Sequence, residues 1–532
     1  MGNIVNKIAV YLNRHLTGCV FDKDSVLEAY SADRSLIKIK PRLVAIPENT
    51  ADIRKLVRFV AQLAQKKYDL PIAVRGSGLS KTGSDLSSGL VISMEKLNHV
   101  KELDPHDRLV HVQAGMTLGK LNAVLAPHGL VLPISADPNE TIGSLIANAT
   151  RDNYSKRYGG IMNYVNRAEI VLANGELVQT SQLKPRKLAE QKNQHTLEAE
   201  IYSKLDNLLT KKAKQINELP KTTSFGYPAI KQVHSNSGHI FDLLPIFYGS
   251  EGTLGIITEV ILKVEVLPPR QHRLLATFPS LKSAKDFMAS AEMLLPLTIE
   301  LYDAEIFKQA DELGKKPEII SKKLDKGYLV LVSFNDKKSR SRRKIRKCEQ
   351  FLPKSAHVVI ETIKNSSDFD AIKDCLSIYI NNTSKGERPS LLHDFYLPKE
   401  QLEGFIDEIK QLSKKYKKSL DIYGCYSTDI YSIRPEFDLS KIDERRTALN
   451  LLRDFNTLLK QCGGILAGGL PEGKLKSIVL YPELDKNHKK LLETIKNIFD
   501  ESKILAPETK TMYDIRSTVR HLRTEPNKYI DS

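Results

Sequence analysis

The sequence lacks the features of metal-cluster, disulfide-bonded and membrane-spanning proteins. It has no tryptophan and only five cysteines among 532 residues, and no two cysteines form a C-x-x-C pair. This scarcity excludes iron–sulfur and zinc sites of the usual spacing, and it predicts a chain without disulfides in a reducing compartment. Because no run of about 18 apolar residues occurs, the sequence predicts no transmembrane helix.

The remaining composition is that of a large globular protein with a basic surface. Hydrophobic residues make up 41% of the chain and charged residues 27%, and the length predicts about two to four domains. The net charge is +16, but lysine and arginine are spread along the whole chain. The densest basic runs, at residues 337–347 and 414–419, lack the interleaved aromatic residues that a base-stacking surface needs. We therefore expect no nucleic-acid partner and a cytoplasmic location, with peripheral contact at the inner membrane face left open.

The order of apolar strands and amphipathic helices predicts an α+β protein with two main domains. Residues 37–268 alternate short strands with helices, and residues 269–510 have the pattern of an antiparallel sheet covered by helices. The two consecutive prolines at 268 and 269 mark the boundary. We expect an N-terminal helical segment at 1–36, a polar helical insertion at about 184–221, and a C-terminal tail at 511–532.

A glycine-rich loop, VRGSGLSKTGSD at residues 74–85, follows a short apolar strand. It contains Gly76, Gly78 and Gly83. Glycine allows backbone N–H groups to converge on an anion, so the loop could cradle a phosphate. Its spacing matches neither the G-x-G-x-x-G fingerprint nor the P-loop. Taken alone, the loop leaves a phosphate cradle and a plain glycine-rich hairpin open.

Two further motifs favour the phosphate cradle. The stretch YGSEGTLGIITEVILKV, at residues 248–264, places three glycines ahead of a strongly apolar strand. Between it and the first loop lies DPNETIG, at residues 137–143, followed by a short helical pattern. Together, the three motifs argue against a plain glycine-rich hairpin or turn at each of them.

With these motifs, the chain resembles the FAD-linked oxidases that have a flavin domain of the vanillyl-alcohol-oxidase type. Within them it is most similar to the branch of D-lactate dehydrogenase, the glycolate oxidase flavoprotein and D-2-hydroxyglutarate dehydrogenase. The resemblance extends over nearly the whole chain, through KRYGG, KTTSFGY, DFYLP, YGCYSTDIYSIRP and GGILAGGLPEGKLKS. It implies a two-subdomain FAD-binding domain, a C-terminal antiparallel-sheet substrate or cap domain, and hydride transfer from a 2-hydroxy acid to FAD.

The resemblance also implies which residues bind FAD. The first loop and DPNETIG would contact the pyrophosphate and one edge of the isoalloxazine, and EGTLGII would line the adenosine and ribitol side. Leu79 stands where covalently flavinylated relatives carry histidine, and no cysteine lies between residues 135 and 160, so we expect noncovalent FAD. Ser144 and Arg151 replace two glycines of the family pattern. The implied FAD-binding residues are Arg75, Gly76, Ser77, Gly78, Leu79, Ser80, Asp137, Thr141, Gly143, Ser144, Asn148, Gly252, Gly255, Ile256 and Ile257.

The catalytic half departs further from the family, whose members hold a divalent metal that polarises the substrate hydroxyl. This chain has Cys425 and Tyr431 at the positions of two histidine ligands, and Gly469 and Leu470 in place of Glu-His. Glycine and leucine side chains cannot ligate a metal, so we expect none at this site. The candidate catalytic residues would supply a base, a cation that binds the substrate anion, and the acidic group that the family has beside the flavin. They are Tyr426, Tyr431 and His393 for the base, Arg434 and Lys373 for the cation, and Glu300 for the acid.

Two functions from different classes stay open at this point. The first is a metal-free FAD-dependent dehydrogenase of a 2-hydroxy acid, or of a different alcohol, that passes electrons to a quinone, cytochrome or protein. The second is a flavin-binding subunit that has lost turnover. The first predicts a small anionic hydroxy acid as substrate, and the second predicts bound FAD that no hydroxy acid reduces.

Overall fold

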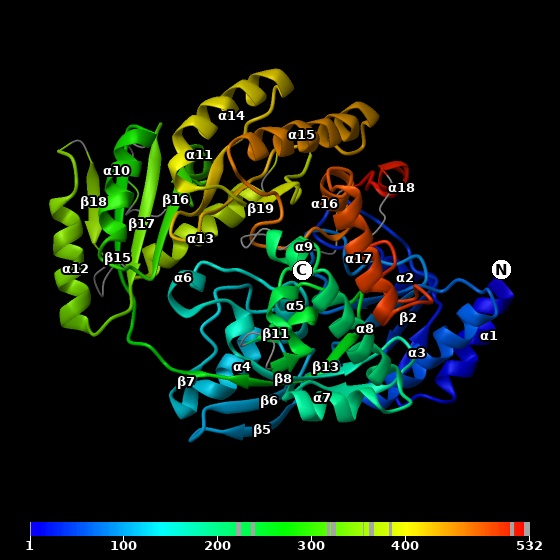
Figure 1. Cartoon of the computed structure of the whole chain (residues 1–532). Coiled ribbons are helices and arrows are strands. Elements are labelled where there is room, and N and C mark those ends of the chain that lie inside the picture. The colour runs from blue at the N-terminus through cyan, green and yellow to red at the C-terminus, as the bar shows by residue number, and fades with distance from the viewer. Residues whose placement is uncertain are drawn as a thin grey trace.

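The computed structural model describes residues 2–219, 225–235, 240–315, 320, 326–354, 356–360, 366–381, 383, 386–510 and 515–525. Parts of the KTTSFGY motif and of the predicted tail at 511–532 lie outside these residues. The described residues form two domains, each built around its own sheets (Figure 1).

Four short apolar strands form the first sheet of the N-terminal domain. In spatial order they are β1 (Cys19–Phe21), β2 (Leu43–Ile46), β4 (Leu90–Ser93) and β3 (Ile72–Arg75). β2, β4 and β3 run parallel, because helix α3 (Thr50–Gln65) makes the crossover from β2 to β3. The Asn49 side chain caps α3 by accepting a hydrogen bond from the Asp52 N–H. The first glycine loop therefore leaves the carboxyl end of a parallel strand.

An antiparallel sheet of five strands shares the core of the first sheet. In spatial order its strands are β5 (Val100–Asp104), β6 (Leu109–Gln113), β13 (Ile256–Lys263), β8 (Val165–Val171) and β9 (Leu177–Gln179). The central strand, β13, begins directly after Gly255, the last glycine of the motif at residues 248–264. Both glycine motifs thus lie at strand ends over one hydrophobic core.

Helices and small strands complete the N-terminal domain. They are α1 (Gly2–Asn13), α2 (Asp24–Ala29), α4 (Leu118–Leu125), β7 (Leu130–Val131), α5 (Ile142–Ala147), α6 (Ser155–Tyr158) and β14 (Glu265–Val266). The stretch predicted as a polar insertion contains α7 (Pro185–Lys192), α8 (Leu197–Lys211) and α9 (Ala213–Glu218), beside strands β10 (Gln182–Leu183), β12 (Ile240–Asp242) and β11 (His234–Ser235). Helix α8 is more than a surface feature, because Ile201 and Leu205 lie in the domain core.

The C-terminal domain is built on a seven-stranded sheet in which all neighbouring strands are antiparallel. In spatial order the strands are β18 (His357–Ile360), β15 (His272–Phe278), β17 (Tyr328–Phe334), β16 (Thr298–Asp303), β20 (Ile422–Cys425), β21 (Ile430–Ile433) and β19 (Leu392–Tyr396). This sheet agrees with the antiparallel pattern of the sequence.

Helices cover both faces of this sheet. One face, called here the outer face, packs against α10 (Leu281–Glu292), α12 (Lys338–Gln350), α14 (Leu402–Tyr416) and α15 (Ile442–Gln461). The other, the inner face, packs against α11 (Glu305–Glu312) and α13 (Ser366–Asn381). Side chains alternate between the faces: in β16, Ile299 and Leu301 belong to the outer core, whereas Tyr302 belongs to the inner one.

The chain returns to the N-terminal domain near its end (Figure 1). Helices α16 (Gly473–Leu480), α17 (Lys486–Phe499) and α18 (Ile515–His521) follow the C-terminal sheet. Leu492 and Ile495 of α17 lie in the N-terminal core, and the Ile72 N–H donates to the Ile504 carbonyl at 2.7 Å. Residues 486–510, which the sequence analysis grouped with the second domain, therefore pack with the first.

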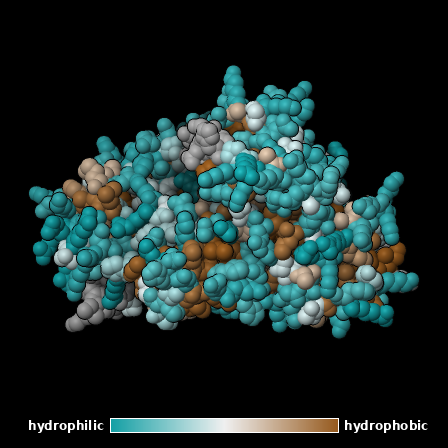
Figure 2. Space-filling model, turned by 60° about the horizontal axis from the view of Figure 1, so that its bottom comes forward, coloured by the Kyte–Doolittle hydropathy of each residue, from teal (hydrophilic) through white to brown (hydrophobic). Residues whose placement is uncertain are grey.

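The face of the molecule shown in Figure 2 is mainly polar. Hydrophilic side chains cover most of the face in Figure 2, and hydrophobic ones gather in separate patches. Among the residues that the structure describes, no helix is both long and apolar enough to cross a membrane.

Candidate functional site

A cavity of about 470 Å³ lies where the glycine motifs of the N-terminal domain meet the inner face of the C-terminal sheet. Fourteen of the fifteen predicted FAD-binding residues line it, and Arg75 is the exception. From the C-terminal domain, the lining residues include three predicted catalytic residues, Glu300, Lys373 and His393.

The first glycine loop packs tightly against the start of α5. A Cβ atom on Gly76 would lie 2.4 Å from Oγ1 of Thr141, and Gly78 has a φ of +73°, which favours glycine. The Arg75 side chain turns under the loop, where its Nη1 is 3.6 Å from Asp85 Oδ2 and its guanidinium lies over the Tyr30 ring. Arg75 therefore lines a neighbouring cavity of about 290 Å³, which Gly76 and Ser77 also line.

The second motif supplies the wall opposite this loop. Thr141 is the N-cap of α5 and accepts a hydrogen bond from the Ser144 N–H at 3.3 Å. The Ser144 hydroxyl donates to the Thr141 carbonyl at 2.8 Å, so the residue that replaces a family glycine is tied to the helix start. Arg151, the other departure, also lines the cavity, and its backbone N–H donates to the Gly469 carbonyl at 3.1 Å.

The third motif is a tight turn held by a buried ion cluster. Glu251 and Gly252 have φ values of 51° and 73°. The Glu251 carboxylate lies 3.0 Å from the Lys510 ammonium, which is also 3.1 Å from the Glu472 carboxylate, and all three side chains are buried. Burial raises the pKa of Glu472 to about 7, and Lys510 opposes the rise. This cluster was not predicted from the sequence, because its members lie in three distant segments.

These walls fit an extended phosphate-containing ligand such as FAD. The glycines leave backbone exposed to the cavity, and a side chain at Gly76 or Gly255 would collide with neighbouring atoms at 2.4 and 2.7 Å. Backbone N–H groups in such turns bind anions.

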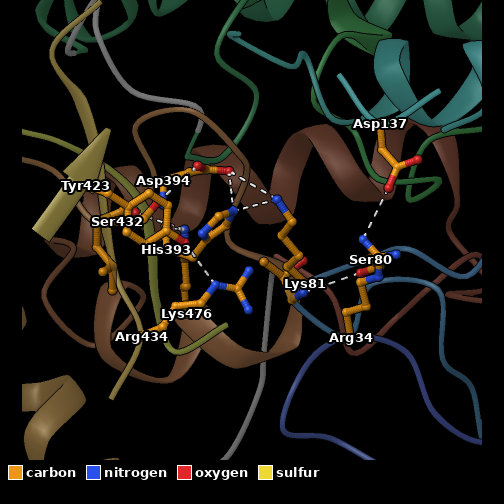
Figure 3. Close-up of polar contacts among 12 residues, drawn as sticks. Arg34, Ser80, Lys81, Asp137, His393, Asp394, Tyr423, Ser432, Arg434 and Lys476 are labelled. Carbon is orange, nitrogen blue, oxygen red and sulfur yellow. Dashed lines mark hydrogen bonds and ion pairs between the residues drawn. The ribbon is translucent and has the colours of Figure 1, made fainter. Parts of the chain in front are cut away.

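Charged side chains from both domains meet at the end of the cavity that the C-terminal domain lines (Figure 3). Lys81, the residue after the predicted cradle, places its Nζ 2.5 Å from His393 Nε2 and 3.8 Å from Asp394 Oδ2. His393 Nε2 is 3.0 Å from Asp394 Oδ2. Asp394 has a φ of 53°, a conformation that costs a non-glycine residue about 1–2 kcal/mol and is concentrated at functional sites.

Burial changes the proton affinities of this cluster. It lowers the pKa of His393 to about 3, and the Asp394 carboxylate opposes that change. Burial likewise lowers the pKa of Lys81. Glu140, which also lines the cavity, has its pKa raised to about 7 by burial. Of these three groups, Glu140 is the one placed to exchange a proton near neutral pH.

Two cations lie beneath the cavity wall. The Arg434 Nε–H donates to the Tyr423 hydroxyl at 3.0 Å and its Nη1 donates to the Arg388 carbonyl at 3.3 Å. Arg434 is not among the residues that line the cavity. Lys476 donates to the His393 carbonyl at 2.7 Å, and burial lowers its pKa to about 8. Lys476 therefore supports the strand that carries His393, whereas Arg434 holds Tyr423 of β20 and the segment before that strand.

The structure does not bring the two candidate tyrosines to the cavity. Tyr426 and Tyr431 belong to the hydrophobic core on the outer face of the sheet, and the Tyr431 ring lies 6.2 Å from that of Phe395. For Tyr431 the reason is strand alternation, because the next residue, Ser432, contacts Asp394 on the other face of the sheet. Glu300 does reach the cavity, where it accepts a hydrogen bond from the Tyr302 hydroxyl at 2.6 Å.

At the positions of the family metal ligands, this chain does not have three side chains that could bind a metal. Burial raises the pKa of the Cys425 thiol to about 12. Gly469 donates its backbone N–H to the Asp394 carbonyl, and Leu470 presents its side chain to the cavity. Among the described residues, no cluster of three or more His, Cys, Asp or Glu side chains could hold a metal ion.

Sequence reasoning missed Lys81, Asp394 and Glu140. A signal existed for Lys81, since a lysine directly after a backbone cradle is placed to reach beyond the phosphates. Asp394 and Glu140 gave no such signal, because carboxylates are most often exposed.

The chain is similar in sequence to flavin enzymes that are named for hydroxy acids. The FAD binding domain family matches residues 41–181, and the family of FAD linked oxidases, C-terminal domain, matches residues 267–509. D-2-hydroxyglutarate dehydrogenase of Escherichia coli K12 is 26% identical over 468 residues, which are 82% of this chain and 45% of that protein. The glycolate oxidase subunit GlcD of Bacillus subtilis 168 is 24% identical over 488 residues, 90% of this chain and 91% of that protein. The chain spans about half the length of the D-2-hydroxyglutarate dehydrogenases that it matches.

The fold is shared with solved flavin oxidases. The 4-ethylphenol oxidase from Gulosibacter chungangensis, in its isoeugenol complex, superposes with a TM-score of 0.68 at 14% identity, covering 97% of this chain and 98% of that one. The predicted α+β architecture, an FAD-binding domain followed by a C-terminal sheet domain, is confirmed. The chain belongs to the FAD-linked oxidases, with a flavin-binding domain of the vanillyl-alcohol-oxidase type and FAD as its cofactor.

Proposed function

We propose that this protein is an FAD-dependent dehydrogenase that oxidises a small 2-hydroxy acid to the 2-oxo acid, with FAD bound noncovalently and no metal at the family position. The observation that carries the proposal is the continuity of the cavity. It extends from the glycine loops to an end lined by Lys81, Lys373 and His393. An anionic substrate would thus meet cations and a base beside the reactive part of the cofactor.

The glycine loops would hold the cofactor through backbone groups. Gly76, Gly78 and Gly252 would approach the phosphates, and Thr141 would fix the start of α5 against the same loop. Leu79 lines the cavity at the position of the family's covalent histidine, and no cysteine is among the lining residues that the structure describes. When bound, FAD accepts the hydride that leaves the α-carbon of the substrate.

Cationic side chains would bind the substrate carboxylate. Lys373 on α13 is exposed and lines the cavity, so it can pair with an anion that enters from solvent. Lys81 adds a second nitrogen deeper in the site. Arg434 would act only indirectly, from beneath the cavity wall, because its guanidinium faces Tyr423 and the Arg388 carbonyl rather than the cavity.

Protein side chains would replace the metal of the relatives. Gly469 and Leu470 offer no ligand, and the nearest carboxylate, Asp394, already has Lys81 and His393 as neighbours. The metal of the relatives polarises the hydroxyl; here the Lys81–His393 pair would draw the hydroxyl proton instead. The names of two relatives, D-2-hydroxyglutarate dehydrogenase and glycolate oxidase, denote enzymes of 2-hydroxy acids and support this substrate class. A quinone, a cytochrome or a protein would then take the electrons.

The test is an anaerobic titration of the FAD-loaded protein. D-Lactate, glycolate and D-2-hydroxyglutarate are added in turn while the flavin absorbance is followed. We expect at least one of them to bleach the flavin band. A flavin band that none of them bleaches would contradict the proposal and favour a flavin-binding subunit without turnover.

A further inference from the structure

Lys81 links the flavin loop to the C-terminal sheet. The side chain leaves the first glycine loop and its Nζ lies 2.5 Å from Nε2 of His393, which is 312 residues away in sequence (Figure 3). Asp394 Oδ2 lies 3.0 Å from the same ring nitrogen. One imidazole nitrogen is thus held between an amine and a carboxylate, and all three residues line the cavity.

The other ring nitrogen of His393 has no protein partner. Its Nδ1 is buried and makes no hydrogen bond to any described residue, and the side chain is only 8% exposed. An unpaired buried polar atom costs about 1–3 kcal/mol, and such atoms in native proteins call for an explanation. At a cavity wall the explanation is a ligand, here one that hydrogen-bonds through a single polar atom such as a hydroxyl.

The protonation of Lys81 decides what Nδ1 can do. If Lys81 is an ammonium, it donates to Nε2, and Nδ1 then carries the ring proton. If Lys81 is a neutral amine, Nε2–H points to the amine and to Asp394, and Nδ1 presents a free lone pair. Burial, together with Arg434 and Arg34, lowers the pKa of Lys81, against the opposing charges of Asp394 and Glu140. The second arrangement is therefore accessible, and it makes Nδ1 a base.

We propose that His393 Nδ1 takes the proton of the substrate hydroxyl and that Nε2 passes its own proton to the Lys81 amine. The assignment rests on the proposed function, since it concerns the same 2-hydroxy acid. The O–H bond of the substrate breaks and its proton binds Nδ1, while the Nε2–H proton moves to Lys81, which becomes an ammonium. The α-carbon releases its hydrogen with the electron pair to the flavin, and the carbon–oxygen bond becomes double. The new ammonium then lies beside the Asp394 carboxylate.

Five variants of the FAD-loaded protein test this relay by anaerobic reduction, and one of them, Glu140→Gln, removes another carboxyl group that lines the cavity. His393→Gln can still hydrogen-bond Asp394 but cannot take a proton, and we expect reduction to slow by about 100-fold or more, the usual contribution of a general base. Lys81→Met and Lys81→Arg remove the amine that accepts the second proton, and both should slow reduction. His111→Gln is the matched control, because His111 pairs with Glu259 at 2.8 Å on strand β6, outside the cavity.

A second readout does not depend on turnover. Nitrogen-15 spectra of histidine-labelled FAD-loaded protein identify His393 as the signal that His393→Gln lacks. We expect this signal to show one protonated and one unprotonated ring nitrogen at neutral pH. It should move on Lys81→Met and stay in place on His111→Gln.

The possible outcomes separate this assignment from the proposed function. If the wild type is reduced and His393→Gln is reduced equally fast, the relay is wrong and the proposed function stands. If Lys81→Arg restores the rate that Lys81→Met loses, Lys81 acts only as a fixed charge, and the transfer to its amine is overturned. If Glu140→Gln alone abolishes reduction, the proton goes to Glu140 instead. If no hydroxy acid reduces the wild type, the proposed function fails and the relay fails with it.

Discussion

Gly76 illustrates how individual residues define the cofactor site. Its missing side chain lets the first loop lie directly on Thr141, with 2.4 Å between Oγ1 and the place a Cβ would occupy. Contacts this short cannot be relieved without moving the loop or the start of α5. The loop and the start of α5 both line the cavity. Any shift would therefore alter the proposed phosphate cradle more than the hydrophobic core.

Gly76→Ala should therefore impair cofactor binding more than folding. We expect FAD affinity to fall by at least about tenfold, the factor that corresponds to about 1.4 kcal/mol, because the loop must move off Thr141. Equilibrium titration of the apoprotein with FAD measures the affinity, and thermal unfolding of the apoprotein measures stability.

Gly404→Ala is the matched control for this substitution. Gly404 lies in α14, and a Cβ there would meet nothing within 4 Å. Alanine in a helix is favoured over glycine by about 0.8–1.0 kcal/mol, so this variant should bind FAD normally and be slightly more stable. Equal FAD affinities for the two variants would show that the close contact at Gly76 does not shape the site.

Most residues proposed to bind the cofactor could be proposed from the sequence and line one cavity, whereas the arrangement at the catalytic end could not be foreseen. The cradle is made by backbone groups in short motifs, so Gly76, Gly78 and Gly252 are recognisable without knowledge of the fold. The pairing of Lys81 with His393 joins residues that are 312 positions apart, and no local pattern reveals it. Tyr431 was a candidate because a tyrosine can act as a base, but strand alternation places its ring on the outer face of the C-terminal sheet.

At the scale of elements, a returning C-terminal segment holds the third glycine motif in place. Lys510 joins Glu251 of that motif to Glu472, which immediately precedes α16, and all three side chains are fully buried. Nearby, Lys496 of α17 donates to the Thr253 carbonyl at 2.7 Å. Two lysines from the end of the chain therefore support a turn whose backbone lines the cavity.

Lys510→Met should destabilise the protein strongly. The substitution leaves two buried carboxylates without their cation, a change that typically costs about 3–5 kcal/mol. Urea unfolding at pH 8 measures the loss. The double variant Lys510→Met, Glu472→Gln should recover part of it, because one uncompensated charge is then removed; no recovery would mean that the cluster is not the cause.

The same variant should be less destabilised in acid. Burial already raises the pKa of Glu472 in the folded protein to about 7 from an ordinary 4.5, so protonation favours the fold. The stabilisation from the protonated form is full below about pH 4.5 and is lost as the pH rises through about 7. Without Lys510 this dependence should steepen. Unfolding curves of Lys510→Met at pH 5.5 and 8 that differ no more than those of the wild type would contradict the account.

At the scale of the whole molecule, the site exists only because two domains meet. The glycine loop carries Lys81 from one domain, and β19 carries His393 and Asp394 from the other. Their protonation therefore bears on how the domains hold together. Acid should weaken this junction, since His393 is kept neutral in the folded protein with a pKa of about 3, below its ordinary 6.5.

This difference in pKa predicts a measurable dependence of stability on pH. Between about pH 6.5 and 3 the unfolded His393 binds a proton that the folded residue does not, so stability falls as the pH falls. His393→Gln removes one titrating group and should lower the slope by up to about 1.4 kcal/mol per pH unit. Urea unfolding between pH 4.5 and 7 compares this variant with the wild type. The same slope in both proteins would show that His393 is not held neutral.

The central claim is that protein side chains at the domain junction do the work of the metal in the relatives. It is tested most directly by anaerobic reduction of FAD-loaded protein that has been stripped of metal with a chelator, with bound metal assayed on the same sample. We predict that the hydroxy acid that reduces the untreated protein bleaches the flavin at the same rate in the metal-free sample. Loss of reduction on chelation, restored by adding zinc or manganese, would contradict the claim and return this protein to the metal-dependent chemistry of its relatives.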